Sequence, residues 1–595
     1  MASTEARPIG SRYLAGLLAV AVVTVVLRAP SFVYPIMDID EGSYAAIACR
    51  MLAGGLPYRD GVENKFPAIF YLYTAVFGLF GRYDMRAVHA VAALAALATA
   101  LAAGAIAATL ARRRGADERA AGRASWLAAI LYAVFSTTYE PKLLAANTEL
   151  FAVLPASLAV LVYLRGRERP SAFIATGALA ACALLFKQVA GLLLVALAAD
   201  RLIRGLLRRQ LRRSITDLIL LGVGAVGIAG AVAVIFWRQG ILGDALFWSW
   251  TYIFHHYMPA ATASGGFVGR LFKCFLPFGL AMSPLLFLGR RVRWRGGALV
   301  VWLWLVAMTG AALIGGRMYG HYFLLTVPPL AVLAGVGGAE WLTTASTAER
   351  RRLAAVVATM AAGFLVAAWL FRGATDSWLR LNPDYRKASA YVRARTQPDD
   401  RLFVWGWFPA LYVDADRCPA SRFVYTHLLS GARSQSGATT RGHLVPEAWP
   451  MLMEDLARTR PAYILDTSPG RYDYPFPPEQ YPALAQLLAS GYRFETEIDG
   501  VRLFKRKEDD PRYAREMRTS ISAMRAESAM TSISTILPPA MTKPNTARGT
   551  PPGAQTAPAA PSTSACRAPR ARPRKVSATA TAPRISGANG GAPLD

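Results

Sequence analysis

Long apolar blocks separated by short, arginine-rich loops constrain this chain more than any other feature of its sequence. A helix needs about 20 apolar residues to cross the hydrocarbon core of a bilayer, and several blocks approach or reach that length. We therefore expect an all-α polytopic membrane protein. The blocks predict eleven spans, near 13–31, 86–111, 124–139, 149–164, 171–186, 189–203, 214–236, 271–289, 297–315, 321–341 and 353–371.

The basic residues of the loops set the expected orientation. Cytoplasmic loops of membrane proteins are enriched in Lys and Arg. With a cytoplasmic N-terminus, the predicted inner loops are the arginine-rich ones, at 112–123, 165–169, 201–213, 290–295 and 350–352. This pattern predicts a multi-pass protein of the plasma (inner) membrane. Because these loops account for much of the net charge of +28, we expect no nucleic-acid partner.

Three stretches are open to a second interpretation. The run at 13–27 follows two arginines like a signal peptide, but no clear cleavage site follows it, so a retained first helix is favoured. The stretch 66–80 is short and predicts an interfacial or re-entrant helix, because a full span there would invert every later loop. Residues 171–203 form either two spans or one bent helix that places Lys187 in mid-membrane.

The cysteines define no known site. None of the five forms a CxxC pair, which argues against zinc-ribbon and thioredoxin-like proteins. Because their number is odd, at least one is unpaired, and their spacing predicts no disulfide framework.

The character of the chain changes after the last span. Residues 372–508 predict a small extracytoplasmic α/β domain, and 509–595 predict a disordered basic tail beyond the membrane domain of 1–371. The domain carries no dinucleotide fingerprint and no Walker loop. Its expected strands are Leu402–Trp405, Phe423–Tyr425, Tyr463–Asp466 and Val501–Phe504, and its expected helices are Trp449–Arg458 and Tyr481–Ser490.

The first outer loop, 32–85, carries an unusual cluster of acids. Asp38, Asp40 and Glu41 lie within four positions directly after the first span. Such a cluster repels itself unless cations or a substrate join it. The alternative is a solvated helix start, where acids are favourable. Composition alone does not decide between these two interpretations.

The first loop carries three short motifs in order: Asp40-Glu41-Gly42-x-Tyr44, Gly54-Gly55-x-Pro57-Tyr58-Arg59-Asp60 and Glu63-Asn64-Lys65-Phe66-Pro67. Their order resembles the first outer loop of glycosyltransferase family 39 and its aminoarabinose-transferase relatives. The resemblance implies a GT-C fold and a polyprenyl-phosphate sugar donor. It implies Asp40, with Glu41 beside it, as the catalytic carboxylate, and Lys65, with Glu63 beside it, at the donor phosphate. The family's Glu-Lys-Pro-Pro is here interrupted by Asn64, which leaves open which side chain points inward.

Other polar residues of the predicted outer side join this hypothesis. Glu149, Lys187, Arg317 and His321 are expected to bind substrate, although each has a structural alternative as a cap or an interfacial residue. Aromatic residues near His255 and His256 form either a substrate groove or an interfacial belt. Adjacent helical histidines point about 100° apart, so these two do not easily share one metal.

The expected reaction is transfer of a sugar from a polyprenyl-phosphate donor to a lipid, glycan or protein hydroxyl at the outer face, with inversion. A divalent metal held by Asp40, Glu41 and His255 is compatible with the sequence but not required by it. The main alternative is a transporter or lipid flippase, against which the sequence shows no internal repeat and groups its polar residues at one face. A scaffolding membrane protein is a third alternative.

Overall fold

The computed structural model describes residues 11–507 apart from 139–140, 167–168, 259–266, 296, 371–384, 431–444, 446 and 471–475, together with 521, 522 and 525. The predicted disordered tail lies almost entirely outside the described residues. The N-terminal helices are α1 (Ser11–Arg28), α2 (Pro30–Val33), α3 (Ile39–Leu52), α4 (Ala68–Phe80), α5 (Met85–Arg113), α6 (Glu118–Phe135), η1 (Pro141–Leu144), α7 (Thr148–Arg165), α8 (Pro170–Phe186), η2 (Gln188–Gly191), α9 (Leu192–Leu207) and α10 (Leu211–Arg238). They are followed by α11 (Leu242–Leu246), the π-helical turns η3 (Phe247–Thr251) and η4 (Ile253–Tyr257), α13 (Phe267–Arg270), η5 (Leu271–Phe275), α14 (Leu276–Ala281), α15 (Ser283–Gly289), α16 (Leu299–Ile314), η6 (Gly320–Thr326), α17 (Val327–Thr344) and α18 (Thr347–Leu370).

All eleven predicted spans fall on helices. Among the described residues, four helices are long and apolar enough to cross a membrane: Met85–Arg113, Thr148–Arg165, Leu211–Arg238 and Gly320–Thr344. A pair bent by 61°, Phe267–Ala281 and Ser283–Gly289, would be a fifth. Helices α1, α4, α8 and α16 are apolar but shorter. The number of spans therefore stays a prediction, while a helical membrane protein is confirmed.

Exposed apolar side chains mark the surface that faces lipid. Helix α10 is the most hydrophobic of the long helices, yet little of it is buried inside the protein. Val226 on this helix is 70% exposed. A soluble protein rarely leaves so long an apolar face in water, so these side chains are explained by contact with lipid.

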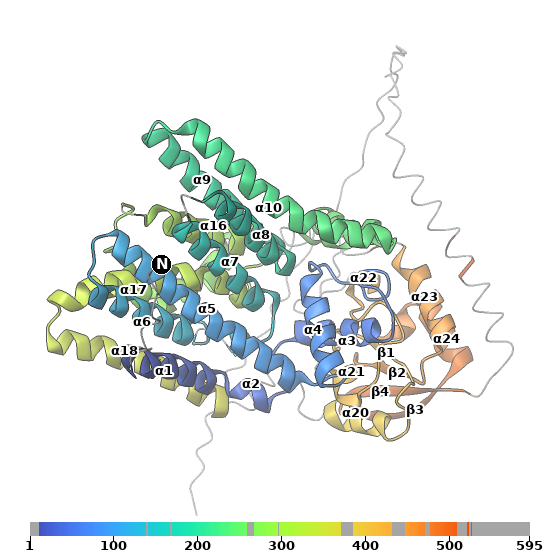
Figure 1. Cartoon of the computed structure of the whole chain (residues 1–595). Helices are drawn as coiled ribbons and strands as arrows, with labels where there is room; N and C mark the ends of the chain where they lie inside the picture. The colour runs from blue at the N-terminus through green and yellow to red at the C-terminus, as the bar shows by residue number, and fades with distance from the viewer. Residues whose placement is uncertain are drawn as a thin grey trace, which may run out of the picture. The chain divides into compact units, whose positions relative to one another are not determined.

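Helices α8 and α10 pack closely because glycines remove side chains from their contact. A Cβ on Gly177 would overlap the carbonyl of Leu221, and a Cβ on Gly224 would overlap the carbonyl of Ile174. Small residues at such contacts are typical of membrane helices, where close backbone approach provides the packing energy. Figure 1 shows the two helices side by side.

The helix between 171 and 203 is interrupted at Lys187. Helix α8 ends at Phe186, Lys187 takes an extended backbone conformation, and the chain resumes through η2 into α9. Of the two alternatives for this segment, the structure therefore shows two helices with the lysine at the break.

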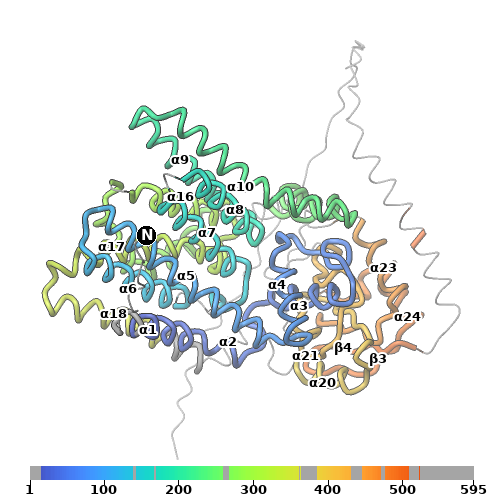
Figure 2. The backbone as a smooth tube through the Cα atoms, in the orientation of Figure 1, coloured from blue at the N-terminus to red at the C-terminus, as the bar shows by residue number. Residues whose placement is uncertain are grey.

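The C-terminal elements form a small mixed sheet with helices. They are α20 (Tyr385–Arg393), β1 (Leu402–Trp405), α21 (Ala410–Ala415), α22 (His427–Ser430), α23 (Ala448–Thr459), β2 (Tyr463–Asp466), η8 (Pro478–Gln480), α24 (Pro482–Gly491), β3 (Tyr492–Ile498) and β4 (Val501–Arg506). The strand order is β1-β2-β4-β3, with β1 parallel to β2 and the other two pairs antiparallel. Figure 2 follows the same path as a tube. Three expected strands and both expected helices are present, whereas β3 was missed.

The strand expected at Phe423–Tyr425 is wrong. This apolar run is buried, but it pairs with no strand and instead follows the first loop. The amide of Val62 donates to the carbonyl of Arg422 at 2.9 Å, and the Tyr425 hydroxyl donates to the carbonyl of Ile39 at 3.0 Å. Burial against another loop produces the same apolar pattern as burial in a sheet.

A disulfide fastens this C-terminal segment to the first loop. Cys49 on α3 is bonded to Cys418 across 369 residues of sequence, with Cα atoms 5.7 Å apart. The neighbouring Arg50 guanidinium donates to the carbonyl of Pro419 at 2.9 Å, and Arg82 pairs with Asp416 at 2.9 Å. The spacing of the cysteines does not predict this pairing, because only the fold brings Cys49 and Cys418 together.

We expect the Cys49→Ser and Cys418→Ser variants to unfold at lower temperature, by similar amounts. Loss of a native disulfide typically costs about 2–5 kcal/mol. Because each single variant already removes the same disulfide, the double variant should be no less stable than either single variant. Thermal unfolding of purified protein measures this, with Cys182→Ser as control, since Cys182 is not disulfide-bonded. Unchanged unfolding temperatures in both single variants would contradict the expectation.

Candidate active site

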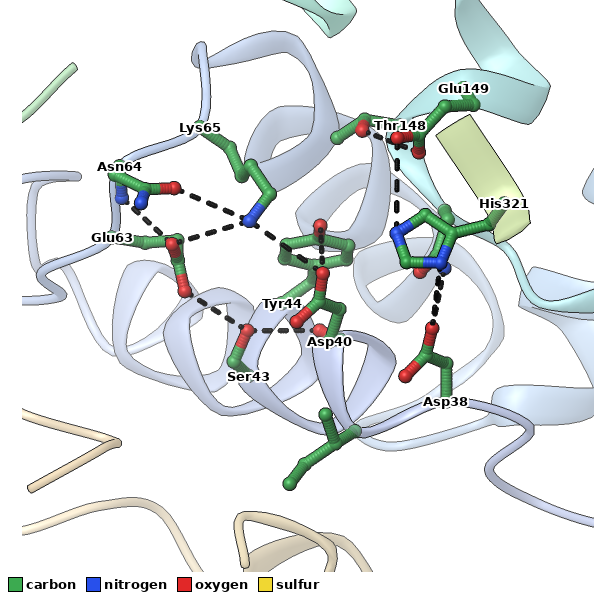
Figure 3. A network of polar contacts seen from close by, with 12 residues as sticks. Asp38, Asp40, Ser43, Tyr44, Glu63, Asn64, Lys65, Thr148, Glu149 and His321 are labelled. Carbon is green, nitrogen blue, oxygen red and sulfur yellow. Dashed lines mark hydrogen bonds and ion pairs between the residues drawn. The ribbon is translucent and has the colours of Figure 1, made fainter. Parts of the chain in front are cut away.

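A polar pocket lies where the first loop meets the C-terminal segment. Acidic and basic side chains line one part of the pocket, and aromatic side chains line the rest. Figure 3 shows how its first-loop residues point toward one another. The lining residues are Asp38, Ile39, Asp40, Glu63, Asn64, Lys65, Lys142, Tyr257, Tyr319, His321, Tyr322, Trp407, Tyr425 and His427.

The three clustered acids at the start of α3 point to different places. Asp38 and Asp40 line the pocket, whereas Glu41 is completely buried outside it. The Glu41 carboxylate accepts from the amide of Met37 at 2.6 Å, contacts His89 Nε2 at 3.0 Å and accepts from the amide of Ala146. Glu41 therefore joins three segments, and the structure does not support its assignment as a catalytic residue.

Lys65 lies between two carboxylates. Its Nζ is 3.6 Å from Asp40 Oδ2 and 3.6 Å from Glu63 Oε1. Figure 3 draws both contacts as dashed lines. Both Glu63 and Lys65 point inward despite the inserted Asn64, whose Oδ1 accepts from Lys65 Nζ at 3.3 Å. Although burial opposes the charge of Lys65, Asp40 and Glu63 outweigh it and raise the lysine pKa.

The two carboxylates beside Lys65 differ in proton affinity. Burial would raise the pKa of Asp40, but the nearby basic residues, Lys65 foremost, outweigh burial and lower it. Burial also raises the pKa of Glu63, and there Lys65 offsets the effect only in part. Of these two carboxylates, Asp40 therefore loses its proton at the lower pH.

A second basic residue of the pocket, Lys142 on η1, was not predicted from the sequence. Its Nζ is 3.6 Å from Asp38 Oδ1, while Asn147 Nδ2 donates to Asp38 Oδ2 at 2.9 Å. His321 Nδ1 lies 3.8 Å from the same oxygen. Lys142 follows a proline in a loop between two predicted spans, and only the fold shows that this loop reaches the acidic cluster.

Glu149 and Lys187 form a buried pair behind the pocket. Lys187 Nζ is 2.6 Å from Glu149 Oε1 and lies 4.2 Å from the centre of the Tyr322 ring. His321 Nε2 is 4.0 Å from the same Glu149 oxygen. The pair contacts the lining residues Tyr322 and His321 but does not line the pocket itself.

Arg317 also lies behind an aromatic wall. Its guanidinium carbon is 5.0 Å from the centre of the Tyr257 ring, and Arg317 donates to the Tyr257 carbonyl at 3.4 Å. The next residue, Met318, has φ 52°, a conformation that costs energy in a non-glycine residue. This turn precedes Tyr319 and His321, which both line the pocket.

The other wall comes from the C-terminal segment. Gly406 and then Trp407 come directly after the end of β1. A side chain at position 406 would clash with Thr467, and the φ of 144° there also favours glycine. Trp407 stacks on Tyr425 at 4.5 Å between ring centres and lies 4.6 Å from His427. None of these three residues was predicted, because nothing in the sequence placed them beside the first loop.

The candidate metal ligands are not brought together. His255 lies on η4 with an exposed side chain and does not line the pocket, and Glu41 is committed elsewhere. Within the described part of the chain, no group of three or more His, Cys, Asp or Glu residues is arranged to hold a metal ion. The proposed set of Asp40, Glu41 and His255 is therefore not a site in this structure.

Comparison with known proteins supports the resemblance seen in the sequence. Residues 64–237 match the family model described as dolichyl-phosphate-mannose-protein mannosyltransferase. The fold matches the crystal structure of ArnT from Cupriavidus metallidurans bound to undecaprenyl phosphate, with a TM-score of 0.55, 16% identity and coverage of 84% of this chain and 99% of that one.

The apo form of the same protein matches with a TM-score of 0.54 and 16% identity, over 83% of this chain and 98% of that one. No curated protein sequence matches the chain significantly. The predicted GT-C fold, with its small C-terminal sheet, is thereby confirmed.

Proposed function

We propose that this chain is an integral membrane glycosyltransferase that moves a sugar from a polyprenyl-phosphate donor to an acceptor hydroxyl, with inversion at the anomeric carbon. The observation that carries the proposal is one pocket that combines an ionised carboxylate, Asp40, with the lysines Lys65 and Lys142. The matching fold of a protein crystallised with undecaprenyl phosphate supports the same donor class.

The chemistry needs one base and one cationic site. The acceptor oxygen attacks the anomeric carbon, and its proton passes to the Asp40 carboxylate. The bond between the anomeric carbon and the phosphate oxygen breaks, and the lipid phosphate leaves with the bonding electron pair. A carboxylate positioned beside the hydroxyl assists the first transfer, and preorganised cations stabilise the negative charge that grows on the phosphate.

Lys65 links these two halves of the reaction. In the unliganded pocket it lies at 3.6 Å from both Asp40 and Glu63, which is longer than a direct hydrogen bond. A donor phosphate would compete for its charge. As Lys65 turns toward the phosphate, Asp40 loses its main cationic partner and becomes a stronger base. Donor binding would thus prepare the carboxylate for proton transfer.

The residues behind the pocket hold its walls in place. The pair of Glu149 and Lys187 supports Tyr322 and His321, and Arg317 supports Tyr257. We therefore assign Glu149, Lys187 and Arg317 as positioning residues in the proposal. Among the cations, Lys65 and Lys142 are the donor-phosphate ligands, because both line the pocket.

The disulfide supports an extracytoplasmic pocket. Disulfides form and persist in oxidising compartments and are rare in the cytosol, and Cys49 lies in the same loop as Asp40 and Lys65. This agrees with the loop charges, which predict a cytoplasmic N-terminus. We propose a multi-pass protein of the plasma (inner) membrane with its C-terminal sheet on the outer side.

Replacement of Lys142 should weaken use of the donor. We expect Lys142→Ala to raise the donor KM by roughly tenfold, since a hydrogen bond to a charged group contributes about 1.5–3 kcal/mol. Donor titration of wild type and variant measures the effect. Lys387→Ala is the control, because Lys387 is 65% exposed on α20, outside the pocket. An unchanged donor KM would exclude Lys142 from phosphate binding.

The proposal is tested with purified protein and labelled polyprenyl-phosphate mannose, glucose, galactose and arabinose, offered with cell-envelope glycolipids and glycans. We expect one donor to release polyprenyl phosphate in an acceptor-dependent way and to yield the inverted anomer, as read by proton NMR. Retention at the anomeric carbon would overturn the single-displacement mechanism. No release from any donor would overturn the function.

A further inference from the structure

Three rings of the C-terminal segment form a continuous aromatic shelf, composed of Trp407, Tyr425 and His427. Trp407 and Tyr425 are nearly parallel, with an angle of 16° between ring planes and 4.5 Å between centres. The centre of the His427 ring lies 4.6 Å from that of Trp407 and 6.0 Å from that of Tyr425. All three line the pocket, and Trp407 and His427 are only partly buried. The shelf therefore offers an accessible aromatic surface inside the pocket.

The shelf is fixed beside the proposed base. Tyr425 donates to the carbonyl of Ile39, the residue that precedes Asp40. Burial, followed by the charges of Asp40 and Glu63, raises the pKa of Tyr425. The position of Tyr425 relative to α3 is also held by the nearby disulfide of Cys49. Whatever group rests on the shelf is consequently held close to the Asp40 carboxylate.

His427 presents an uncharged ring in this shelf. Burial and the nearby Lys65 lower its pKa to about 3, so the imidazole stays neutral over the physiological range. A neutral imidazole has one N–H donor and one acceptor nitrogen. This combination suits a hydroxyl group, which can both donate and accept, better than it suits a phosphate.

We propose that the aromatic shelf binds a sugar ring of the acceptor, so that the acceptor is a glycan or glycolipid rather than a serine or threonine side chain. This inference rests on the proposed glycosyl transfer. One face of a pyranose or furanose presents C–H bonds, which pack against the electron-rich face of an aromatic ring, while its edge presents hydroxyls. A serine or threonine side chain has no such face.

The placement of the cations assigns the shelf to the acceptor rather than to the donor. Lys65 and Lys142, which would hold the donor phosphate, belong to the first loop and to η1, both within the membrane-associated part of the chain. The shelf instead belongs to the segment that follows the last apolar helix, α18. In a single displacement the acceptor hydroxyl approaches from the side opposite the leaving phosphate and must lie beside its base, Asp40.

Sugar binding is measured first, by saturation-transfer NMR of the full-length protein in nanodiscs. The probes are the methyl glycosides of mannose, glucose, galactose and arabinofuranose, with a serine- and threonine-containing tetrapeptide for comparison. We expect saturation of the ring protons of at least one glycoside, roughly tenfold weaker binding in Trp407→Ala, and substantial recovery in Trp407→Phe, as for loss of one ring contact. Phe494→Ala is the control, because Phe494 is a 57% exposed aromatic residue on β3, outside the pocket.

Two results would overturn the inference. One is that no glycoside is bound by wild type, or that binding is the same in Trp407→Ala. The other is stronger binding of the tetrapeptide than of any glycoside. Retention of the Cys49–Cys418 disulfide in Trp407→Ala verifies that the variant is folded.

Kinetics separate this inference from the proposed function. For Trp407→Ala we expect a rise of roughly tenfold in the acceptor KM, with the donor KM unchanged. If wild type releases polyprenyl phosphate but Trp407→Ala changes neither constant, the shelf assignment is wrong and the glycosyl transfer stands. If wild type binds glycosides through Trp407 but releases no polyprenyl phosphate, sugar binding stands and the glycosyl transfer is wrong.

Discussion

Asp40→Asn should abolish sugar transfer while leaving the protein folded and inserted in the membrane. The amide has nearly the same shape as the carboxylate but cannot take the proton of the acceptor hydroxyl. General-base catalysis contributes about 10²–10⁴-fold to rate, so we expect a loss of at least roughly 100-fold in kcat. Because Asp40→Asn removes a negative charge from the pocket that binds an anionic donor, donor affinity should stay the same or increase. Release of labelled polyprenyl phosphate at saturating donor measures the loss.

Two further variants sharpen this prediction. Asp244→Asn removes an exposed carboxylate paired with Arg59 outside the pocket, and such surface pairs contribute little, so its activity should match wild type. Glu63→Gln tests the other carboxylate beside Lys65 and should retain more activity than Asp40→Asn, because Glu63 holds its proton more readily. If Glu63→Gln were inactive and Asp40→Asn active, Glu63 would be the base.

Lys65→Ala should have the second largest effect, through the donor phosphate. Removal of one preorganised electrostatic contact to the transition state typically costs about 10²–10³-fold in rate. Asp40 and Glu63 would then face each other without the shared cation, which also opposes binding of an anionic donor. We expect both a lower kcat and a higher donor KM, measured by donor titration.

The substitution Lys65→Arg provides a matched comparison. It keeps the charge but replaces a compact ammonium by a planar guanidinium, so partial activity is expected. Lys387→Ala should behave as wild type, because Lys387 is exposed and lies outside the pocket. Wild-type donor KM and kcat in Lys65→Ala would show that the phosphate is bound elsewhere.

The sequence was sufficient for the helices and for half of the pocket. The apolar blocks predicted the helices, because each block approaches the length that a helix needs to cross the hydrocarbon core. The first-loop motifs identified Asp40, Glu63 and Lys65 as site residues. Periodicity could not tell Asp40 from Glu41, because neighbouring helical residues point about 100° apart and only packing decides which one is buried. His89 and Ala146, from distant segments, contact the Glu41 carboxylate and so orient this side chain away from the pocket.

The other half of the pocket depended on contacts between distant segments. Trp407, Tyr425 and His427 lie more than 320 positions after the first loop and reach it through a disulfide and backbone hydrogen bonds. A buried loop and a buried strand have the same apolar composition, which is why Phe423–Tyr425 was mistaken for a strand. Lys142 likewise gains its place only because η1 folds against the acidic cluster.

The fate of the donor in sealed proteoliposomes tests the central claim most directly. The protein is reconstituted with a doubly labelled polyprenyl-phosphate sugar, one label on the lipid and one on the sugar, and with acceptor on the side that the first loop faces. For a glycosyltransferase we expect the two labels to separate, with free polyprenyl phosphate formed and the sugar joined to acceptor on that side. Movement of the intact donor to the other leaflet, with both labels together and no phosphate released, would contradict it and show a flippase.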